Sequence, residues 1–106
     1  MAAAICKDTA TSVSAAGTTQ GTATELASAD SEVTTVGSGA GVVLSSKLSP
    51  GDQQTVFNWG VNPLRIYPTS GMKINSLATN VPMLLSVNTG VLFKCVSTTR
   101  VFGVLS

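Results

Sequence analysis

Few residues in the sequence are suited to catalysis or metal binding. There is no histidine, which removes the usual partner of Ser and Cys nucleophiles and most zinc sites. Among the acidic residues only Asp30 and Glu32 are near neighbours. On a strand these two carboxylates share a face, so an acid/base pair or a weak calcium site is conceivable. A turn-forming Asp at a strand entrance is the commoner reason for such a pair, and we expect that role here.

Neither the glycines nor the cysteines form a recognisable site. Gly37–Gly41 lacks the spacing of a dinucleotide or phosphate loop, and we expect a flexible loop between strands. Cys6 and Cys95 are too few and too far apart for a structural zinc site. A bridge between them is possible, but no secretory context favours it, and Cys95 lies in an apolar pattern typical of a buried thiol. The sequence therefore predicts no catalytic residue, no metal ligand and no cofactor.

The composition points to a small protein with a partly covered surface. The 106 residues suit one domain, and only 10% of them are charged, against about 25% in ordinary soluble domains. A neutral surface coated with Ser and Thr is one explanation. We favour another, in which other subunits cover much of the surface. The basic residues are scattered and the net charge is +1, so we expect no nucleic-acid partner.

Targeting segments are not expected either. The N-terminal residues lack the basic region and the long apolar run of a signal peptide. No stretch approaches the roughly 18 apolar residues of a membrane helix. The sequence therefore predicts no membrane partner and folding in a cytosol.

The elements expected to position these residues are strands. All five aromatic residues lie within Gly51–Ser106, and we expect the dense core there. No helical period occurs, and turn signals recur every eight to twelve residues, which predicts an all-β fold, a small antiparallel β-sandwich or barrel. The predicted strands are Ser31–Val36, Val42–Leu44, Gln54–Trp59, Leu64–Tyr67, Met83–Val87, Val91–Val96 and Arg100–Leu105.

Two details of pairing follow from the pattern. The short connection Val61–Pro63 predicts that Gln54–Trp59 and Leu64–Tyr67 form an antiparallel hairpin. The strands Val91–Val96 and Arg100–Leu105 are largely apolar on both faces. An antiparallel sheet with one solvated face alternates more cleanly, so the second face is expected to meet a second sheet or another subunit.

The first 29 residues differ from the rest. Met1–Ala29 is rich in Ala, Ser, Thr and Gly, and its large apolar residues are sparse: Ile5, Val13 and Leu26. Such a segment cannot build a core alone. We therefore expect an extended arm over residues 1–29, laid across a neighbour through these three side chains, and a β domain over residues 30–106.

Several motifs resemble small virion structural proteins of tailed bacteriophages. The resemblance rests on Ser12–Leu26, on Val33–Val36 with Gly41–Leu44, on Pro50–Gln53, on Phe93–Ser97, and on a central pattern of Asn58, Gly60, Asn62, Ile66–Pro68, Gly71, Ile74–Asn75, Leu77–Ala78 and Asn80. It implies a non-enzymatic head decoration or cement protein in the virion, assembled in the host cytoplasm. Its implied partners are the major capsid protein and other copies of itself, as a homotrimer.

The candidate partner contacts combine these arguments. Similar proteins often carry a Trp after the final Ser-x-Thr, where this sequence has Arg100 and Phe102. Trp59 and Tyr67 suit core or interface packing, or alternatively stacking on a sugar or base. The predicted contact set is Ile5, Val13, Leu26, Trp59, Tyr67, Arg100 and Phe102. Two rival functions remain: a tail-fibre or baseplate module that binds a host glycan, and a stand-alone carbohydrate-binding or toxin-like β domain.

Overall fold

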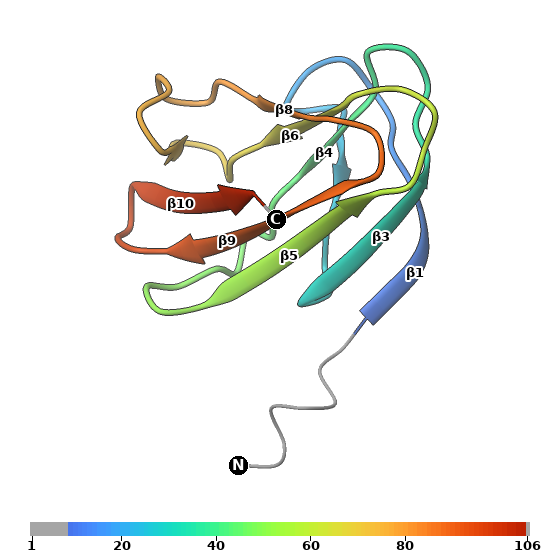
Figure 1. Cartoon of the computed structure of the whole chain (residues 1–106). Helices are drawn as coiled ribbons and strands as arrows, with labels where there is room; N and C mark the ends of the chain where they lie inside the picture. The colour runs from blue at the N-terminus through green and yellow to red at the C-terminus, as the bar shows by residue number, and fades with distance from the viewer. Residues whose placement is uncertain (1–8, 106) are drawn as a thin grey trace, which may run out of the picture.

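The structure, a computed structural model, describes residues 9–105, and among them all regular elements are strands. The strands form two sheets (Figure 1), with the orders β1-β3-β5-β9-β10-β7 and β2-β4-β6-β8. The predicted all-β class is confirmed. The strand bounds are β1 Thr9–Ser14, β2 Thr24–Glu25, β3 Asp30–Thr35, β4 Gly41–Val43, β5 Gln53–Asn58, β6 Leu64–Tyr67, β7 Lys73–Ile74, β8 Met83–Leu85, β9 Thr89–Cys95 and β10 Arg100–Leu105.

The chain alternates between the sheets along its first six strands. β1, β3 and β5 lie parallel in the larger sheet, and β2, β4 and β6 lie parallel in the smaller one. Each pair of strands thus makes one turn of a solenoid-like coil. β8 pairs antiparallel with β6, β9 with β5, and β10 with β9, whereas β7 pairs parallel with β10. The sheets are therefore mixed, which corrects the expectation of an antiparallel sandwich or barrel.

The predicted hairpin of β5 and β6 is wrong, because the two strands belong to different sheets. The cause is the corner after β5, where Asn58 is fully buried. Its Nδ2 donates to the carbonyl oxygens of Asn62 and Leu85, and its Oδ1 accepts from the N–H of Gly60, each at 3.0 Å. Gly60 packs so closely that a Cβ would lie 2.6 Å from Val36 Cγ2. These contacts direct the chain across to the smaller sheet.

Residues 9–29 contribute two strands to the sheets and pack against the rest of the domain, instead of forming an extended arm. β1 pairs with β3, and β2 pairs with β4. Leu26 is buried in the core, and Val13 packs against it. The backbone hydrogen bonds of short strands explain this, because they require few large side chains. The expectation of an extended arm is thus corrected for residues 9–29, whereas Ile5 and Cys6 lie outside the described residues.

The core between the sheets is mostly aliphatic and draws on both halves of the chain. Phe93 and Tyr67 are the buried aromatic residues, whereas Phe57 is half-buried and Trp59 and Phe102 are exposed. The expectation that the core is built from residues 51–106 and their aromatic side chains is therefore only partly right. The core cluster comprises Leu26, Val33, Val36, Val42, Leu44, Val56, Leu64, Ile66, Met72, Ile74, Leu85, Val91, Phe93, Cys95 and Val101.

Candidate interaction surface

Within residues 9–105, no group of three or more Cys, Asp or Glu side chains is close enough to hold a metal ion. Asp30 and Glu32 do share one face of β3, as the spacing predicts, and both are half-buried. The thiol of Cys95 is buried, and this burial raises its pKa above the ordinary value. Burial and a raised pKa describe an unreactive structural cysteine.

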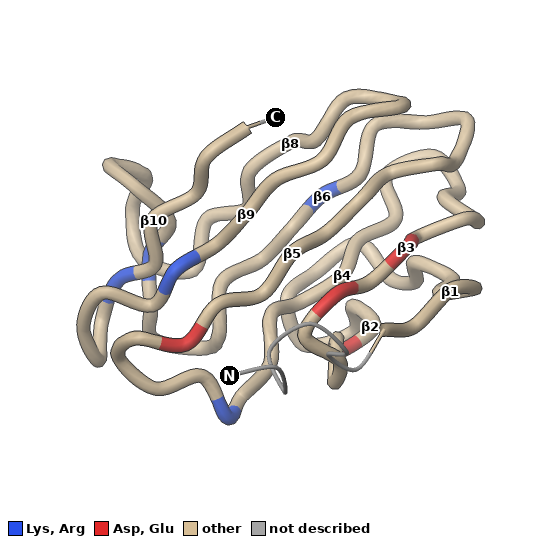
Figure 2. Tube along the Cα trace, turned by 60° about the horizontal axis from the view of Figure 1, so that its bottom comes forward, with Lys and Arg blue, Asp and Glu red and all other residues tan. Residues whose placement is uncertain are grey.

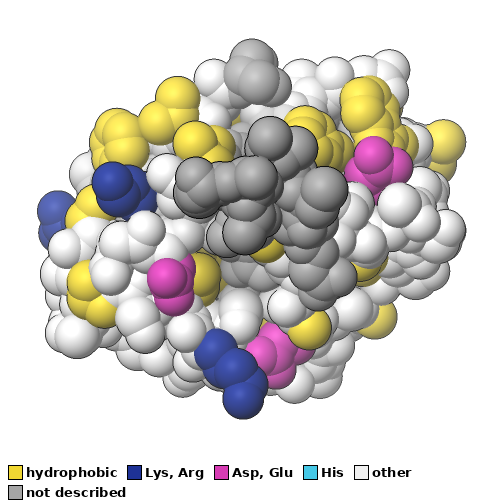
Figure 3. Space-filling model, turned by 90° about the horizontal axis from the view of Figure 1, so that it is seen from below, with side chains coloured by type: hydrophobic (Ala, Val, Ile, Leu, Met, Phe, Trp, Pro, Cys, Tyr) yellow, Lys and Arg dark blue, Asp and Glu magenta, His cyan; other side chains and the backbone are white. Residues whose placement is uncertain are grey.

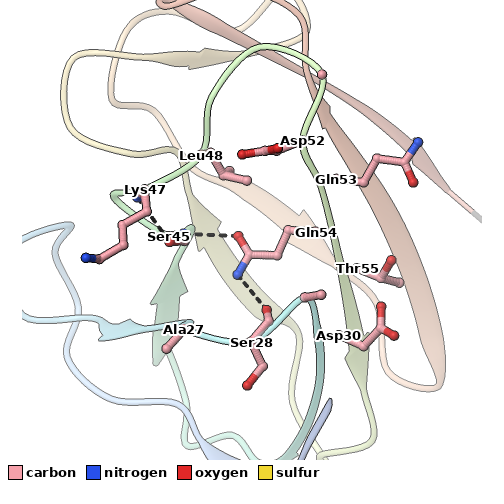
Figure 4. Close-up of a pocket in the computed structure, with 12 residues that line it drawn as sticks. Ala27, Ser28, Asp30, Ser45, Lys47, Leu48, Asp52, Gln53, Gln54 and Thr55 are labelled. Carbon is pink, nitrogen blue, oxygen red and sulfur yellow. Dashed lines mark hydrogen bonds between the residues drawn. The ribbon is translucent and has the colours of Figure 1, made fainter. Parts of the chain in front are cut away.

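A hollow of about 460 Å³ lies between β5 and the loops after β2 and β4 (Figure 4). Gln54 lies at its base, with Nε2 donating to the carbonyl oxygens of Leu26 and Ser28 and Oε1 accepting from the N–H of Ser45, each at 3.0 Å. Asp52 points into the hollow, and its Oδ2 accepts from the N–H of Ser49 at 2.9 Å. The side chains of Gln54 and Asp52 thus hold the loops around this hollow.

The asparagine-rich central motif has a structural explanation of the same kind. Asn58 ties the corner after β5, and Asn62 Nδ2 donates to the carbonyl oxygen of Val36 at 2.8 Å. Asn75 joins β10, with its Oδ1 accepting from the N–H of Gly103 at 2.9 Å. Asn75 also has a φ of 51°, a left-handed conformation that Asn tolerates better than most residues. These asparagines of the motif therefore fix corners and strand contacts of the fold.

The surface of interest is the outer face, which we define as the side of the larger sheet that points away from the smaller one. The register places its central side chains in adjacent pairs: Thr55 beside Leu92, Leu92 beside Val104, and Lys94 beside Phe102. Burial alternates along β5 and β9, which confirms that these side chains point outward. Leu92, Val104 and Phe102 are 38%, 50% and 53% exposed. They form a continuous apolar strip rather than scattered single residues.

Aromatic residues extend this strip along β5. Phe57 lies on the same face as Thr55, and its ring stacks on that of Trp59, with centroids 6.1 Å apart and planes 6° from parallel. Trp59 remains 48% exposed. Large aromatic side chains held in a fixed orientation at a surface are typical anchors of protein interfaces.

The two sheets differ in how their outer sides are covered. Residues 15–23 pack on the outside of the smaller sheet, where Ala16 pairs with Gly41 and the Tyr67 hydroxyl donates to the carbonyl oxygen of Thr18 at 2.9 Å. Gln20 Nε2 also donates to the carbonyl oxygen of Pro68 at 2.8 Å. No segment within residues 9–105 covers the outer face in this way, as the exposure of its apolar strip shows.

Charges flank the outer face at opposite corners. Arg100 lies on β10 and Lys94 on β9. Lys73 on β7 lies beside Arg100 in the strand register. We call these three residues the basic corner. Asp30 and Glu32 on β3 form the acidic corner. Figure 2 shows basic residues at the β9–β10 side and acidic residues on β3. Four further charged residues of the described chain lie outside the two corners: Glu25 on β2, Lys47 after β4, Asp52 before β5 and Arg65 on β6.

The charged corners are not neutralised within the described chain. None of their five side chains forms an ion pair with another residue between Thr9 and Leu105. In Figure 3 apolar side chains adjoin basic ones on one side of the molecule and an acidic one on the other. The outer face therefore offers an apolar strip with free charges of opposite sign at its two ends.

Three of the predicted contact residues lie at the surface. Trp59, Arg100 and Phe102 are exposed, and Phe102 belongs to the apolar strip. Leu26 and Tyr67 are buried, so as folded they cannot contact a partner. Val13 is half-buried against the core, and Ile5 lies outside the described residues.

Leu92, Val104 and Phe57 lie on the outer face but are absent from the set predicted from the sequence. The signal for the first two was present in the sequence, because both faces of the last two strands are apolar. Phe57 could have been found only by knowing which face of β5 is inward.

The described part of the chain contains no helix of the length and apolarity needed to cross a membrane. The chain matches no protein-family model, no curated protein and no solved structure.

Proposed function

We propose that the chain is a bacteriophage virion structural protein. Its favoured role is that of a capsid decoration or cement protein, which binds the major capsid shell and stabilises it as an oligomer. In this proposal the role is non-enzymatic and needs no cofactor, and the protein resides on the capsid surface after assembly in the host cytoplasm. The observation that carries the proposal is the outer face, a sheet surface that no segment within residues 9–105 covers, with an apolar strip in a protein with few charges.

The physical argument concerns repetition. A subunit that occupies many equivalent positions on a shell needs only modest contacts at each, because linked weak contacts sum to strong attachment. A surface of apolar side chains with few charges suits lasting contacts between subunits. Exposed apolar side chains also occur away from the outer face and supply further contacts for the shell. They are Val61, Leu77, Val81 and Leu84.

The main alternative is a tail-fibre or baseplate module that binds a host glycan. Exposure of Trp59, stacked on Phe57, favours it, because a rigid ring surface suits stacking on a sugar. Burial of Tyr67 weakens it, because the second predicted aromatic is then unavailable. The hollow beside Gln54 is lined by no aromatic residue.

Copy number in purified particles separates the two roles. Quantitative mass spectrometry should find this chain in numbers comparable with the major capsid protein, and a particle map should place it on the head. Particles that lack the chain should release their DNA at a lower temperature than complete particles. A few copies confined to the tail would overturn the decoration role and favour the glycan-binding alternative.

A further inference from the structure

We propose that the outer face binds the outer face of a second copy of the chain, with the two sheets crossed at about a right angle. This names a second copy as the partner of the outer face, in a two-fold contact and not in the homotrimer that the resemblance implies. It rests on the proposed function only in treating that surface as a subunit contact. The argument comes from the positions of the charges and of the apolar strip on one face.

The charges favour a two-fold contact. The acidic corner is Asp30 and Glu32, and the basic corner is Lys73, Lys94 and Arg100. In a two-fold contact, any pairing of one patch with a different patch of the partner occurs twice, once in each direction. The acidic corner of each copy therefore meets the basic corner of the other, which forms two identical sets of charge pairs.

The sheet geometry then fixes the axis. From β3 to β10 is three strand spacings, about 14 Å, at about 4.8 Å each. Along the strands, the register places the basic corner about two residue pairs from the acidic corner, or about 13 Å. The line joining the corners therefore runs at about 45° to the strands. A two-fold axis that lies in the plane of the face, perpendicular to that line, exchanges the two corners. It makes the strands of one copy cross those of the other at about 90°, which is an established mode of sheet packing.

The same axis brings the apolar side chains together. Leu92 lies close to the axis, so it meets Leu92 of the second copy. Phe57 lies opposite Phe102 of the second copy, which buries two half-exposed aromatic rings in each contact. The two-fold operation that pairs the charges thus also buries the apolar strip of each copy against the other. The charged residues and the apolar residues are different sets, so these are two separate observations.

The size of the face sets the expected strength. At the usual spacings it measures about 25 Å by about 20 Å, which puts the contact at the small end of specific interfaces, near about 600 Å² per partner. Contacts at this end of the range are typical of weak association, so we expect a dimer that dissociates at about micromolar concentration. Exposed charge pairs should make it weaker as salt is added.

Sedimentation velocity of the full chain between about 1 and about 100 μM tests the association. A monomer–dimer equilibrium that shifts toward monomer at high salt is expected. A trimer, or a monomer at every concentration, would overturn the two-fold contact, and particle binding is measured separately from it.

The charge arrangement is tested by the double variants Lys94→Glu/Arg100→Glu and Asp30→Lys/Glu32→Lys. Each alone should dimerise at least about tenfold more weakly.

An equimolar mixture of the two double variants should recover dimer, because each then supplies the charges that the other lost. Recovery also shows that both variants fold, and Lys47→Glu outside the face is the matched control. Failure of the mixture to recover, with native circular dichroism for both variants, would refute the pairing.

The axis itself is tested by Leu92→Cys in a Cys6→Ser background. This variant should form a disulfide-linked dimer under mild oxidation, whereas Val61→Cys in the same background should not. Equal cross-linking of the two variants would refute the placement of the axis.

Discussion

The buried amide of Asn58 provides the sharpest test of how this sequence specifies its fold. The side chain is fully buried and makes three hydrogen bonds of 3.0 Å, to Gly60, Asn62 and Leu85. At about 0.5–1.5 kcal/mol net for each bond, Asn58→Ala should lose about 3 kcal/mol of unfolding free energy. A domain of this size has about 5–15 kcal/mol in total. The substitution should therefore remove a large part of the stability.

Urea denaturation followed by far-UV circular dichroism and by the fluorescence of the single Trp59 measures this loss. With a slope of about 1–3 kcal/mol per molar urea, the midpoint should fall by about 1–3 M. Asn62→Ala is the matched control, because it removes one half-buried bond to Val36 and should cost about 1 kcal/mol. The control separates the loss of stability caused at this corner from the general loss caused by removing an asparagine side chain.

A second substitution at the same position tests the mechanism. Asn58→Leu keeps the number and branching of the side-chain heavy atoms but makes none of the bonds, so it should be at least as unstable as the alanine variant. If leucine restored the stability, or if the alanine variant lost less than about 1 kcal/mol, side-chain hydrogen bonding would not be what directs this corner. The explanation for the failed hairpin prediction would then be wrong.

Further predictions concern the core role of Leu26 and the two groups whose pKa values are shifted, Glu25 and Cys95. Leu26→Ala should cost about 2–5 kcal/mol by urea denaturation, because Leu26 is core and not an arm contact. The N–H and hydroxyl of Ser46 donate to the Glu25 carboxylate and lower its pKa, so its contribution is complete above pH 4.5 and is lost as pH falls through the lowered value. Acid titrations of stability should therefore show a smaller loss below pH 4.5 for Glu25→Gln than for the natural chain. In a Cys6→Ser background, buried Cys95 should resist alkylation until urea unfolds the chain.

Most of the strands could be predicted, because local alternation and turn residues mark them, whereas β1, β2 and β7 were not predicted. β3, β5, β6 and β10 lie within one or two residues of their expected positions. The sheet to which each strand belongs could not be predicted, because distant contacts decide it. Asn58 reaches Leu85, and Gln54 reaches Leu26, across 27 and 28 residues. No property of a short window contains such pairs.

Exposure of the candidate contact residues could be predicted only where the local sequence pattern was enough to assign it. Arg100 and Phe102 lie on a strand whose two faces are both apolar, and the sequence shows this directly. Leu26 was misplaced because a single leucine among small polar residues has no local pattern that assigns it to the core. Tyr67 was misplaced because the loop covering it comes from residues 15–23, far away in the sequence.

The orientation of β5, with its amide side chains inward and its aromatic face outward, connects these incorrect predictions to the proposed contact. Alternation shows that Gln54, Val56 and Asn58 oppose Thr55 and Phe57, but hydrophobicity alone would turn the aromatic face inward. Burying Gln54 and Asn58 is favourable only because both amides find partners in the corners of the coil. The coil therefore places amides in its core and leaves Phe57 outside, beside the strip formed by β9 and β10. An isolated chain gains nothing from that exposure, whereas a second copy of the outer face would bury it.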